Sequence, residues 1–169
     1  MQIYLPIFET LDVAELRWMV AGGWAVSLHG APRMTVDLDL VVDLEPPAGQ
    51  ELLEAFRRLG LVPQLPVPPQ NLLDASLRRR WQEERGLRAF SWYDAANPLR
   101  IVDLVLALPA PFEDLWQRRA MFSVRGRRIA AVSRKDLVAM KEQASRPRDL
   151  EDLRRLMQSR DDEPGGQRS

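Results

Sequence analysis

The stretch that most constrains this fold runs from residue 19 to residue 43, and it holds two apolar runs in a fixed order. The first run ends at Gly22 and Gly23 and leads into apolar residues at helical spacing. The second run carries Asp37 and Asp39, one residue apart. Because side chains alternate between the two faces of a strand, both aspartates are expected on one face and the apolar residues on the other. The pattern predicts a strand, a glycine turn, a short helix and a second strand.

Two carboxylates side by side on an apolar strand are costly unless a positive group meets them. A third acid, Asp103, is isolated in the same way within an apolar run at 99–106. Aspartate oxygens are hard ligands that suit magnesium, and three of them in two strands fit a site that holds two ions. The alternative is a strand with one wet face, on which acids are ordinary. The repetition in a second strand favours a metal site made of Asp37, Asp39 and Asp103.

Several residues nearby have the chemistry of a phosphate site. Paired glycines such as Gly22 and Gly23 usually mark a tight turn, but before a helix they leave backbone N–H groups free for a phosphate. Arg33 and Thr35 share the parity of the two strand aspartates, and both side chains can bind a triphosphate. For Arg33, a structural ion pair with one of those aspartates is the alternative.

The C-terminal part offers Lys141, which lies on the inward stripe of a predicted helix. It either reaches a phosphate or extends to the rim of the protein. The charged residues that follow are expected to form a solvated first turn in which acids favour the helix dipole; they are Arg146, Arg148, Asp149 and Asp152. His29 is expected to be a packed helix residue with a satisfied ring.

Composition excludes several classes of function. The chain has no cysteine, which rules out disulfides, thiolate metal sites and a cysteine nucleophile, and a single histidine rules out multi-histidine zinc sites. The net charge is zero, so no global field draws the chain to nucleic acid or membrane. Arginine runs at 78–88 and 118–128 could bind a polynucleotide acceptor, but the interleaved Glu83 and Glu84 favour the alternative that they are exposed faces. No apolar run approaches the roughly 20 residues of a membrane span, and no leader is visible, so a cytoplasmic protein without a membrane partner is expected.

The rest of the sequence predicts an α+β chain. Strands are expected at 17–21, 35–42, 61–65, 87–93 and 99–106, helices at 10–16, 24–28, 71–85 and 112–120 and between Pro46 and Gly60, and a hairpin at 122–132. Two further helices are expected to open at Ser133 and Pro147. The predicted organisation is a core at 1–132, a helical extension at 133–160 packed on it, and a disordered tail at 161–169.

With these residues in view, the chain resembles the polymerase-beta-type nucleotidyltransferase superfamily. The signature of that superfamily is G-[GS], roughly a dozen residues, D-h-[DE]-h, and a third acid on a later strand; here thirteen residues separate Gly23 from Asp37. The finer pattern G-G-W-A-x-x-x-H-G-x-P-R-x-T-x-D-x-D-L and the tail D-L-V-A-M-K…R-P-R-D-L-E-D-L are similar to a prokaryotic branch. That branch includes abortive-infection toxin nucleotidyltransferases and lincosamide-type adenylyltransferases, and the resemblance covers about residues 15–158.

The resemblance implies a nucleotidyltransferase fold, a mixed β-sheet flanked by helices with a C-terminal helical pair. It implies transfer of a nucleoside monophosphate from an NTP, such as ATP, to an acceptor, with release of pyrophosphate. Asp37 and Asp39 would hold both magnesium ions, while Asp103 would hold the ion that activates the acceptor and would take its proton. The triphosphate would be held by Gly22, Gly23, Arg33, Thr35 and Lys141.

The sequence leaves the acceptor open between a small molecule, a tRNA and a protein, and a toxin of this kind implies a cognate antitoxin. Gly23 stands where many members have a serine that binds a phosphate, and the short tail leaves little surface for a large acceptor. Two rival functions remain: a non-catalytic NTP-binding regulatory or antitoxin-like module on the same fold, and a structural or interaction protein with surface acids. The three intact aspartates favour the enzyme.

Overall fold

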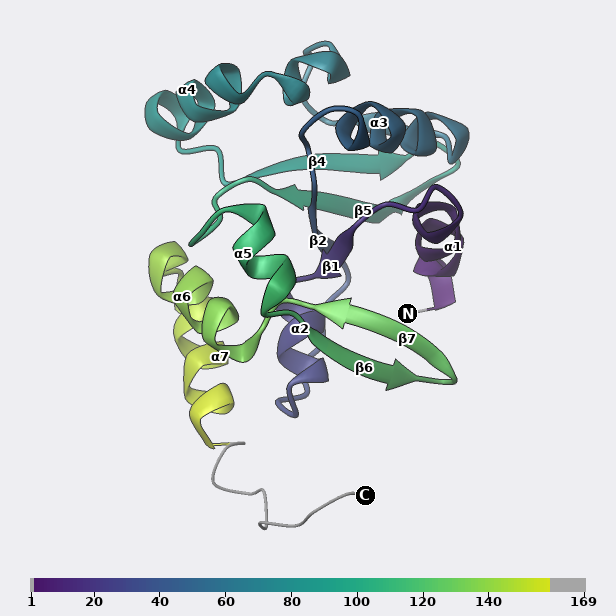
Figure 1. Ribbon diagram of the computed structural model, residues 1–169. Coiled ribbons are helices and arrows are strands. Elements are labelled where there is room, and N and C mark those ends of the chain that lie inside the picture. Colours follow the sequence, from purple (N-terminus) through teal and green to yellow (C-terminus); the bar gives the residue numbers. More distant parts are fainter. Residues whose placement is uncertain (1, 159–169) are drawn as a thin grey trace.

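The computed structural model describes residues 2–158, and within them the strands form one mixed sheet in the order β3-β4-β5-β2-β1-β7-β6 (Figure 1). The strands are β1 (Trp18–Val20), β2 (Leu38–Val42), β3 (Leu61–Pro63), β4 (Ala89–Asp94), β5 (Asn97–Val105), β6 (Ala120–Val124) and β7 (Arg127–Ala131). The helices are α1 (Leu5–Val13), α2 (Gly22–Leu28), α3 (Ala48–Arg58), α4 (Ala75–Arg85), α5 (Phe112–Gln117), α6 (Arg134–Ala144) and α7 (Pro147–Gln158), with 3-10 segments at Gln2–Tyr4 and Pro69–Leu73. The α+β class and the mixed sheet are confirmed.

Strand β2 holds the centre of the sheet. It runs antiparallel to β1 and parallel to β5, and in the parallel pair Asp39 lies directly opposite Asp103. Strand β4 pairs with the far side of β5, where Ser91 lies opposite Asp103. Because residues in register on neighbouring strands share a face, Ser91, Asp103 and Asp39 form a polar row across three strands.

The opposite face of these three strands is apolar. Leu38 and Leu40 are completely buried, and Phe56 of α3 packs edge-on against Trp92 of β4 at a centroid distance of 5.2 Å. Figure 1 shows α3 and α4 on one side of β4 and β5, and α2, α6 and α7 on the other. The core therefore lies under α3, and the polar row is left to face the C-terminal helices.

The second strand is shorter than expected, and the prediction of a strand over 35–42 is wrong at its start. Strand β2 begins at Leu38, so residues 33–37 form a loop. The buried Tyr4 side chain explains the difference: its hydroxyl donates to the carbonyl oxygen of Val36 at 2.6 Å and lies 3.1 Å from that of Ile101. The Tyr4 hydroxyl thereby takes up backbone carbonyl groups of both segments, one of them just before β2 begins.

Two helices also differ from expectation. The helix predicted at 10–16 spans Leu5–Val13, and it ends before Glu15, whose φ of +53° does not fit a helix. The helix predicted at 71–85 is divided, because the Asp74 side chain accepts hydrogen bonds from the N–H groups of Ser76 and Leu77 and starts α4 there.

The remaining elements fall where the sequence places them, including the β6–β7 hairpin and the C-terminal pair α6 and α7. Ser133 caps α6 by accepting from the N–H of Asp136. The boundary between core and extension at residue 132 stays a prediction, and the tail predicted at 161–169 lies outside the described residues. No helix between residues 2 and 158 has the length and apolarity needed to cross a bilayer.

Candidate active site

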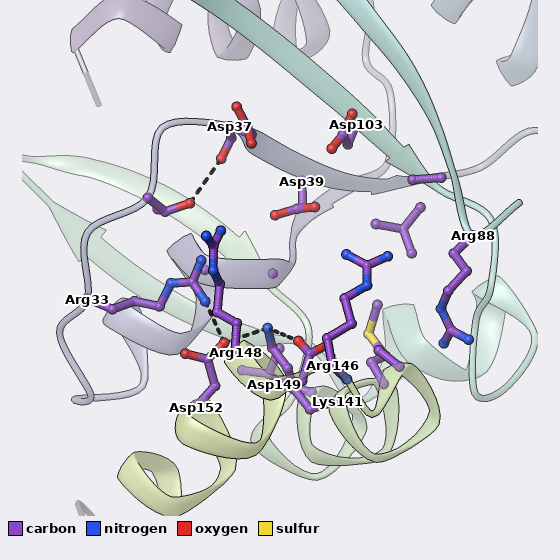
Figure 2. A pocket seen from close by; sticks show the side chains of 18 of the residues that line it. Arg33, Asp37, Asp39, Arg88, Asp103, Lys141, Arg146, Arg148, Asp149 and Asp152 are labelled. Atoms are coloured by element: carbon purple, nitrogen blue, oxygen red, sulfur yellow. Dashed lines mark hydrogen bonds and ion pairs between the residues drawn. The ribbon is translucent and has the colours of Figure 1, made fainter. Parts of the chain in front are cut away.

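A cleft of about 1580 Å³ lies over the polar row of the sheet, and α2 and the corner between α6 and α7 form its other walls (Figure 2). All eight residues that the sequence singles out line this cleft: Gly22, Gly23, Arg33, Thr35, Asp37, Asp39, Asp103 and Lys141. Figure 2 shows the three aspartates on the same side of it. Asp39 and Asp103 project from paired strands, whereas Asp37 lies in the bend immediately before β2.

The two glycines are required by close packing against the aspartates and their neighbours. Gly22 has a φ of +54°, and a Cβ atom at this position would lie 1.8 Å from Oδ2 of Asp39. A Cβ atom at Gly23 would lie 2.7 Å from Nε of Arg33 and 2.8 Å from Cβ of Thr35. All three distances are far shorter than van der Waals contact, so the glycines let the start of α2 approach the cleft floor.

Negative charge accumulates on the cleft floor, and among the described residues none of the three aspartates has a cation within salt-bridge distance. Burial raises the pKa of Asp39 from 3.8 to about 6, and the charges of Asp103 and Asp37 add to the effect. Lys141 and a hydrogen bond from the Gly23 N–H oppose it in part. Burial, followed by the charge of Asp37, also raises the pKa of Asp103. Carboxylates that resist ionisation in this way favour a bound cation.

The residues fit a divalent cation by charge and by an open ligand position. Oδ1 of Asp103 is buried and has no hydrogen-bond partner in the structure, so it is available to a metal. The described residues do not contain three such side chains already gathered around one point. The fit therefore rests on the kind of ligand present, which is hard carboxylate oxygens on two adjacent strands. The carboxylates would have to approach one another when an ion binds.

The opposite wall contains a buried ion-pair network. Nζ of Lys141 lies 2.9 Å from Oδ1 of Asp149 and 2.7 Å from Oδ2 of Asp152. Nη1 of Arg33 lies 2.5 Å from the same Asp152 oxygen. Lys141, Asp149 and Asp152 are all less than a tenth exposed. Thus Lys141 does not extend to the rim, and Arg33 pairs with Asp152 instead of with a strand aspartate.

The expectation of a solvated first turn for α7 is therefore wrong for Asp149 and Asp152. The cause is a sharp corner at Ser145, whose φ of +51° ends α6 and folds α7 back against it. Asp149 and Asp152 then face Lys141, which precedes them by 8 and 11 residues in the sequence. Arg146 and Arg148 remain exposed and line the cleft, in agreement with the expectation for those two residues.

The remaining predicted residues are placed as follows. The Thr35 hydroxyl lies 3.5 Å from the carbonyl oxygen of Asp37, a distance at the limit of a hydrogen bond, and the side chain lines the cleft. His29 lies outside the cleft lining: Nε2 is 2.9 Å from the carbonyl oxygen of Val132, and the ring packs edge-on against Phe122. The prediction of a packed histidine with a satisfied ring is confirmed.

The sequence interpretation missed the role of Arg85 and Arg88 in the cleft wall, because both were assigned to an exposed arginine face. Arg88 is half-buried, and its carbonyl oxygen accepts hydrogen bonds from the N–H groups of Leu106 at 2.9 Å and Ala107 at 3.1 Å. The only sequence signal for Arg88 was its place in a predicted strand next along the chain to that of Asp103; the structure pairs these two strands.

Comparison with solved structures identifies the fold. The chain is similar to the antibiotic-resistance factor ANT(2'')-Ia, with a TM-score of 0.61 and 13% identity over 94% of this chain and 82% of that one. It is also similar to the lincosamide antibiotic adenylyltransferase LnuA, with a TM-score of 0.59 and 12% identity over 89% of this chain and 92% of that one. An antigenic nucleotidyltransferase-like protein from Paracoccidioides brasiliensis gives 0.51 and 15%, over 93% and 73%. No curated protein sequence matches significantly.

Comparison with family models identifies the family. Residues 9–167 match the model described as nucleotidyl transferase AbiEii toxin, type IV toxin–antitoxin system. This match confirms the resemblance to the nucleotidyltransferase superfamily and to its abortive-infection branch. The chain belongs to the AbiEii nucleotidyltransferase toxin family and is a nucleotidyltransferase.

Proposed function

We propose that this protein transfers a nucleoside monophosphate from an NTP to an acceptor and releases pyrophosphate, with Asp37, Asp39 and Asp103 as its catalytic residues. The observation that carries the proposal is the in-register pair of Asp39 and Asp103 on the cleft floor, with Oδ1 of Asp103 buried and unpartnered. An acidic pair that is costly in the free protein is expected of a site built for a cation.

The proposed cofactor is magnesium, as two ions. Asp37 and Asp39 would hold both ions, and Asp103 would hold the one nearer the acceptor. When bound, the ions supply positive charge at the transferring phosphate and at the attacking and leaving oxygens.

The proposed transfer makes one bond and breaks one bond. An oxygen of the acceptor attacks the α-phosphorus, and the bond from that phosphorus to the bridging oxygen breaks with its electron pair leaving on pyrophosphate. If the acceptor is a hydroxyl, its proton passes to the carboxylate of Asp103. Burial and the charge of Asp37 raise the pKa of Asp103, which makes it a stronger base than an ordinary aspartate.

The triphosphate is assigned to the α2 side of the cleft, to Gly22, Gly23, Arg33, Thr35 and Lys141. The guanidinium of Arg33 and the ammonium of Lys141 share Asp152, which holds them in the wall before the nucleotide arrives. These residues contribute by positioning and charge neutralisation, which account for most of the catalysis in phosphoryl transfer.

The proposal includes ATP as a donor, because the structurally similar LnuA is an adenylyltransferase and ANT(2'')-Ia has been solved with adenylyl-2''-tobramycin. It also includes a toxin role with a cognate antitoxin, as the family description suggests. The acceptor is a small molecule, a tRNA or a protein.

The test is to incubate the protein with magnesium, each NTP labelled at the α- or the γ-phosphate, and separate small-molecule, RNA and protein fractions. Label should move from the α-position only, and Asp39→Asn should abolish the movement while Asp94→Asn, a change in a buried aspartate outside the cleft, should not. A non-catalytic module would bind NTP and magnesium and move no label. Movement of γ-label would indicate a kinase and contradict the proposal.

A further inference from the structure

The cleft contains more arginine than its internal ion pairs use. Within the part of the chain that the structure describes, four cleft arginines have no acidic side chain within salt-bridge distance: Arg85, Arg88, Arg146 and Arg148. By contrast, the other cleft cations are paired: Arg33 with Asp152, Lys141 with Asp149 and Asp152, and Arg155 with Glu151. Positive charge that a fold gathers at a concave site without partners is suited to an anionic ligand.

The backbones of two of the four arginines are held in defined positions. The backbone of Arg88 is held by the two hydrogen bonds to its carbonyl oxygen, and its side chain is half-buried. Arg146 stands at the corner between α6 and α7, between Ser145 in the left-handed conformation and Pro147. Figure 2 shows Arg88 on the β4 side of the cleft and Arg146 projecting from the helical corner toward the carboxylates.

The place of Arg88 separates it from the residues assigned to the triphosphate, whereas Arg146 adjoins one of them, because Asp149 accepts hydrogen bonds from both the Lys141 ammonium and the Arg146 N–H. Gly22, Gly23 and Arg33 lie on the α2 side, whereas Arg88 lies where β4 begins, three residues from Ser91 and on the far side of Asp103. Attacking and leaving oxygens lie roughly in line in phosphoryl transfer. If pyrophosphate leaves on the α2 side, the acceptor enters on the side of Arg88.

We infer that Arg88 binds a phosphate group of the acceptor, and that the acceptor of this nucleotidyltransferase is therefore a phosphate-bearing molecule. The inference rests on the proposed function and specifies the acceptor. A guanidinium group binds phosphate through two parallel N–H···O bonds, which fixes orientation as well as charge. A polycationic acceptor such as the tobramycin of the similar ANT(2'')-Ia would bring its ammonium groups close to the unpaired Arg88 guanidinium, so this side of the cleft disfavours it.

The phosphate can come from a mononucleotide or from an RNA strand, and a binding experiment distinguishes them. Fluorescently labelled decauridylate is titrated with the full-length protein in magnesium, with and without a non-hydrolysable ATP analogue in the donor site. Uridine 5'-monophosphate, uridine and tobramycin serve as competitors. If the monophosphate displaces the probe at a similar concentration of phosphate, the acceptor is a small molecule. If decauridylate binds and the monophosphate does not displace it, the acceptor is RNA. Either result supports the inference.

The matched variants are Arg88→Gln, Arg88→Lys and Arg80→Gln, the last in an exposed arginine that does not line the cleft. Arg88→Gln should weaken phosphate binding about tenfold, as expected for one charged hydrogen-bonded contact. Arg88→Lys should weaken it less, and Arg80→Gln should have no effect. The affinity for the ATP analogue should be the same in all of them.

The inference is overturned if uridine competes as well as its monophosphate, if tobramycin competes best, or if Arg88→Gln binds the probe like the wild type. The proposed function fails separately: the wild type would then move no α-label in the transfer assay, whereas the probe titration without analogue would still report on Arg88.

Discussion

Replacing Asp39 by asparagine should stabilise the metal-free protein while abolishing its activity. The isosteric amide removes a charge that the fold holds on the cleft floor beside Asp103, in register on the neighbouring strand. Burial raises the pKa of Asp39 from 3.8 to about 6. At about 1.4 kcal/mol per unit, ionised Asp39 costs the folded state up to about 3 kcal/mol at neutral pH. For a chain of this size the melting temperature should rise by roughly 3–10 °C.

The pH dependence gives the sign of this effect. Because the pKa of Asp39 is higher in the folded state, the group is protonated at low pH and its cost is absent below about pH 4. The cost develops as pH rises and is complete somewhat above pH 6. The melting temperatures of wild type and Asp39→Asn should therefore coincide at the acid end and separate between about pH 4 and pH 7.

The assay is a set of melting curves in chelator, with Asp94→Asn as the matched control. Asp94 is also buried, at the end of β4 in the same sheet, but its carboxylate is 2.6 Å from Nη1 of Arg100 and accepts from the Ala96 N–H at 2.8 Å. Its replacement should lower the free energy of unfolding by roughly 1.5–3 kcal/mol, the worth of hydrogen bonds to a charged group.

Magnesium with an ATP analogue should then raise the melting temperature of the wild type and leave that of Asp39→Asn nearly unchanged. The reasoning is refuted if Asp39→Asn melts below the wild type in chelator at pH 7.5, as Asp94→Asn should. It is also refuted if the ligands raise both melting temperatures equally.

The remaining predictions concern packing around the cleft. Gly22→Ala should abolish transfer and lower the melting temperature, because the new methyl group would lie 1.8 Å from Oδ2 of Asp39; unchanged activity in a label-transfer assay would contradict the packing. Lys141→Met should cost roughly 3–5 kcal/mol in a urea titration, since it leaves the buried Asp149 without its cation and Asp152 with Arg33 alone; a loss below about 1 kcal/mol would show that water replaces the ammonium. Tyr4→Phe should lower the free energy of unfolding by about 1–3 kcal/mol and reduce activity, because the carbonyl oxygen of Val36 loses its donor and the loop that carries Asp37 loosens. Equal hydrogen exchange of that loop in both proteins would argue against this.

The sequence predicted the acidic floor of the site because its signal is local. Asp37 and Asp39 are one residue apart in an apolar run, and Asp103 repeats the pattern, so their residue types alone suggest an ion. Asp39 lies opposite Asp103 because β2 and β5 are parallel neighbours in the sheet. Neither apolar run indicates this pairing, which depends on the topology of the whole chain. The expectation that Asp37 and Asp39 share one face of a strand does not hold for Asp37, which lies in the bend before β2.

The sequence predicted Lys141 at this site but did not predict the ion-pair network of the opposite wall, because the contacts of that network join distant segments. Asp152 binds Arg33 across 119 residues, and nothing near either residue indicates the other. The corner at Ser145 that makes this contact possible uses a left-handed residue that is not glycine, so it leaves no recognisable turn signal. Tyr4, which shortens β2, acts in the same way over 32 residues.

The central claim is that the three aspartates form the divalent-cation site of a nucleotidyltransferase, and direct counting of bound metal tests it. Manganese in place of magnesium can be counted by electron paramagnetic resonance in the presence of a non-hydrolysable ATP analogue. We expect two bound manganese ions per chain in the wild type, one in Asp103→Asn, and none held by the aspartates in Asp39→Asn. Wild-type stoichiometry in both variants would contradict the claim.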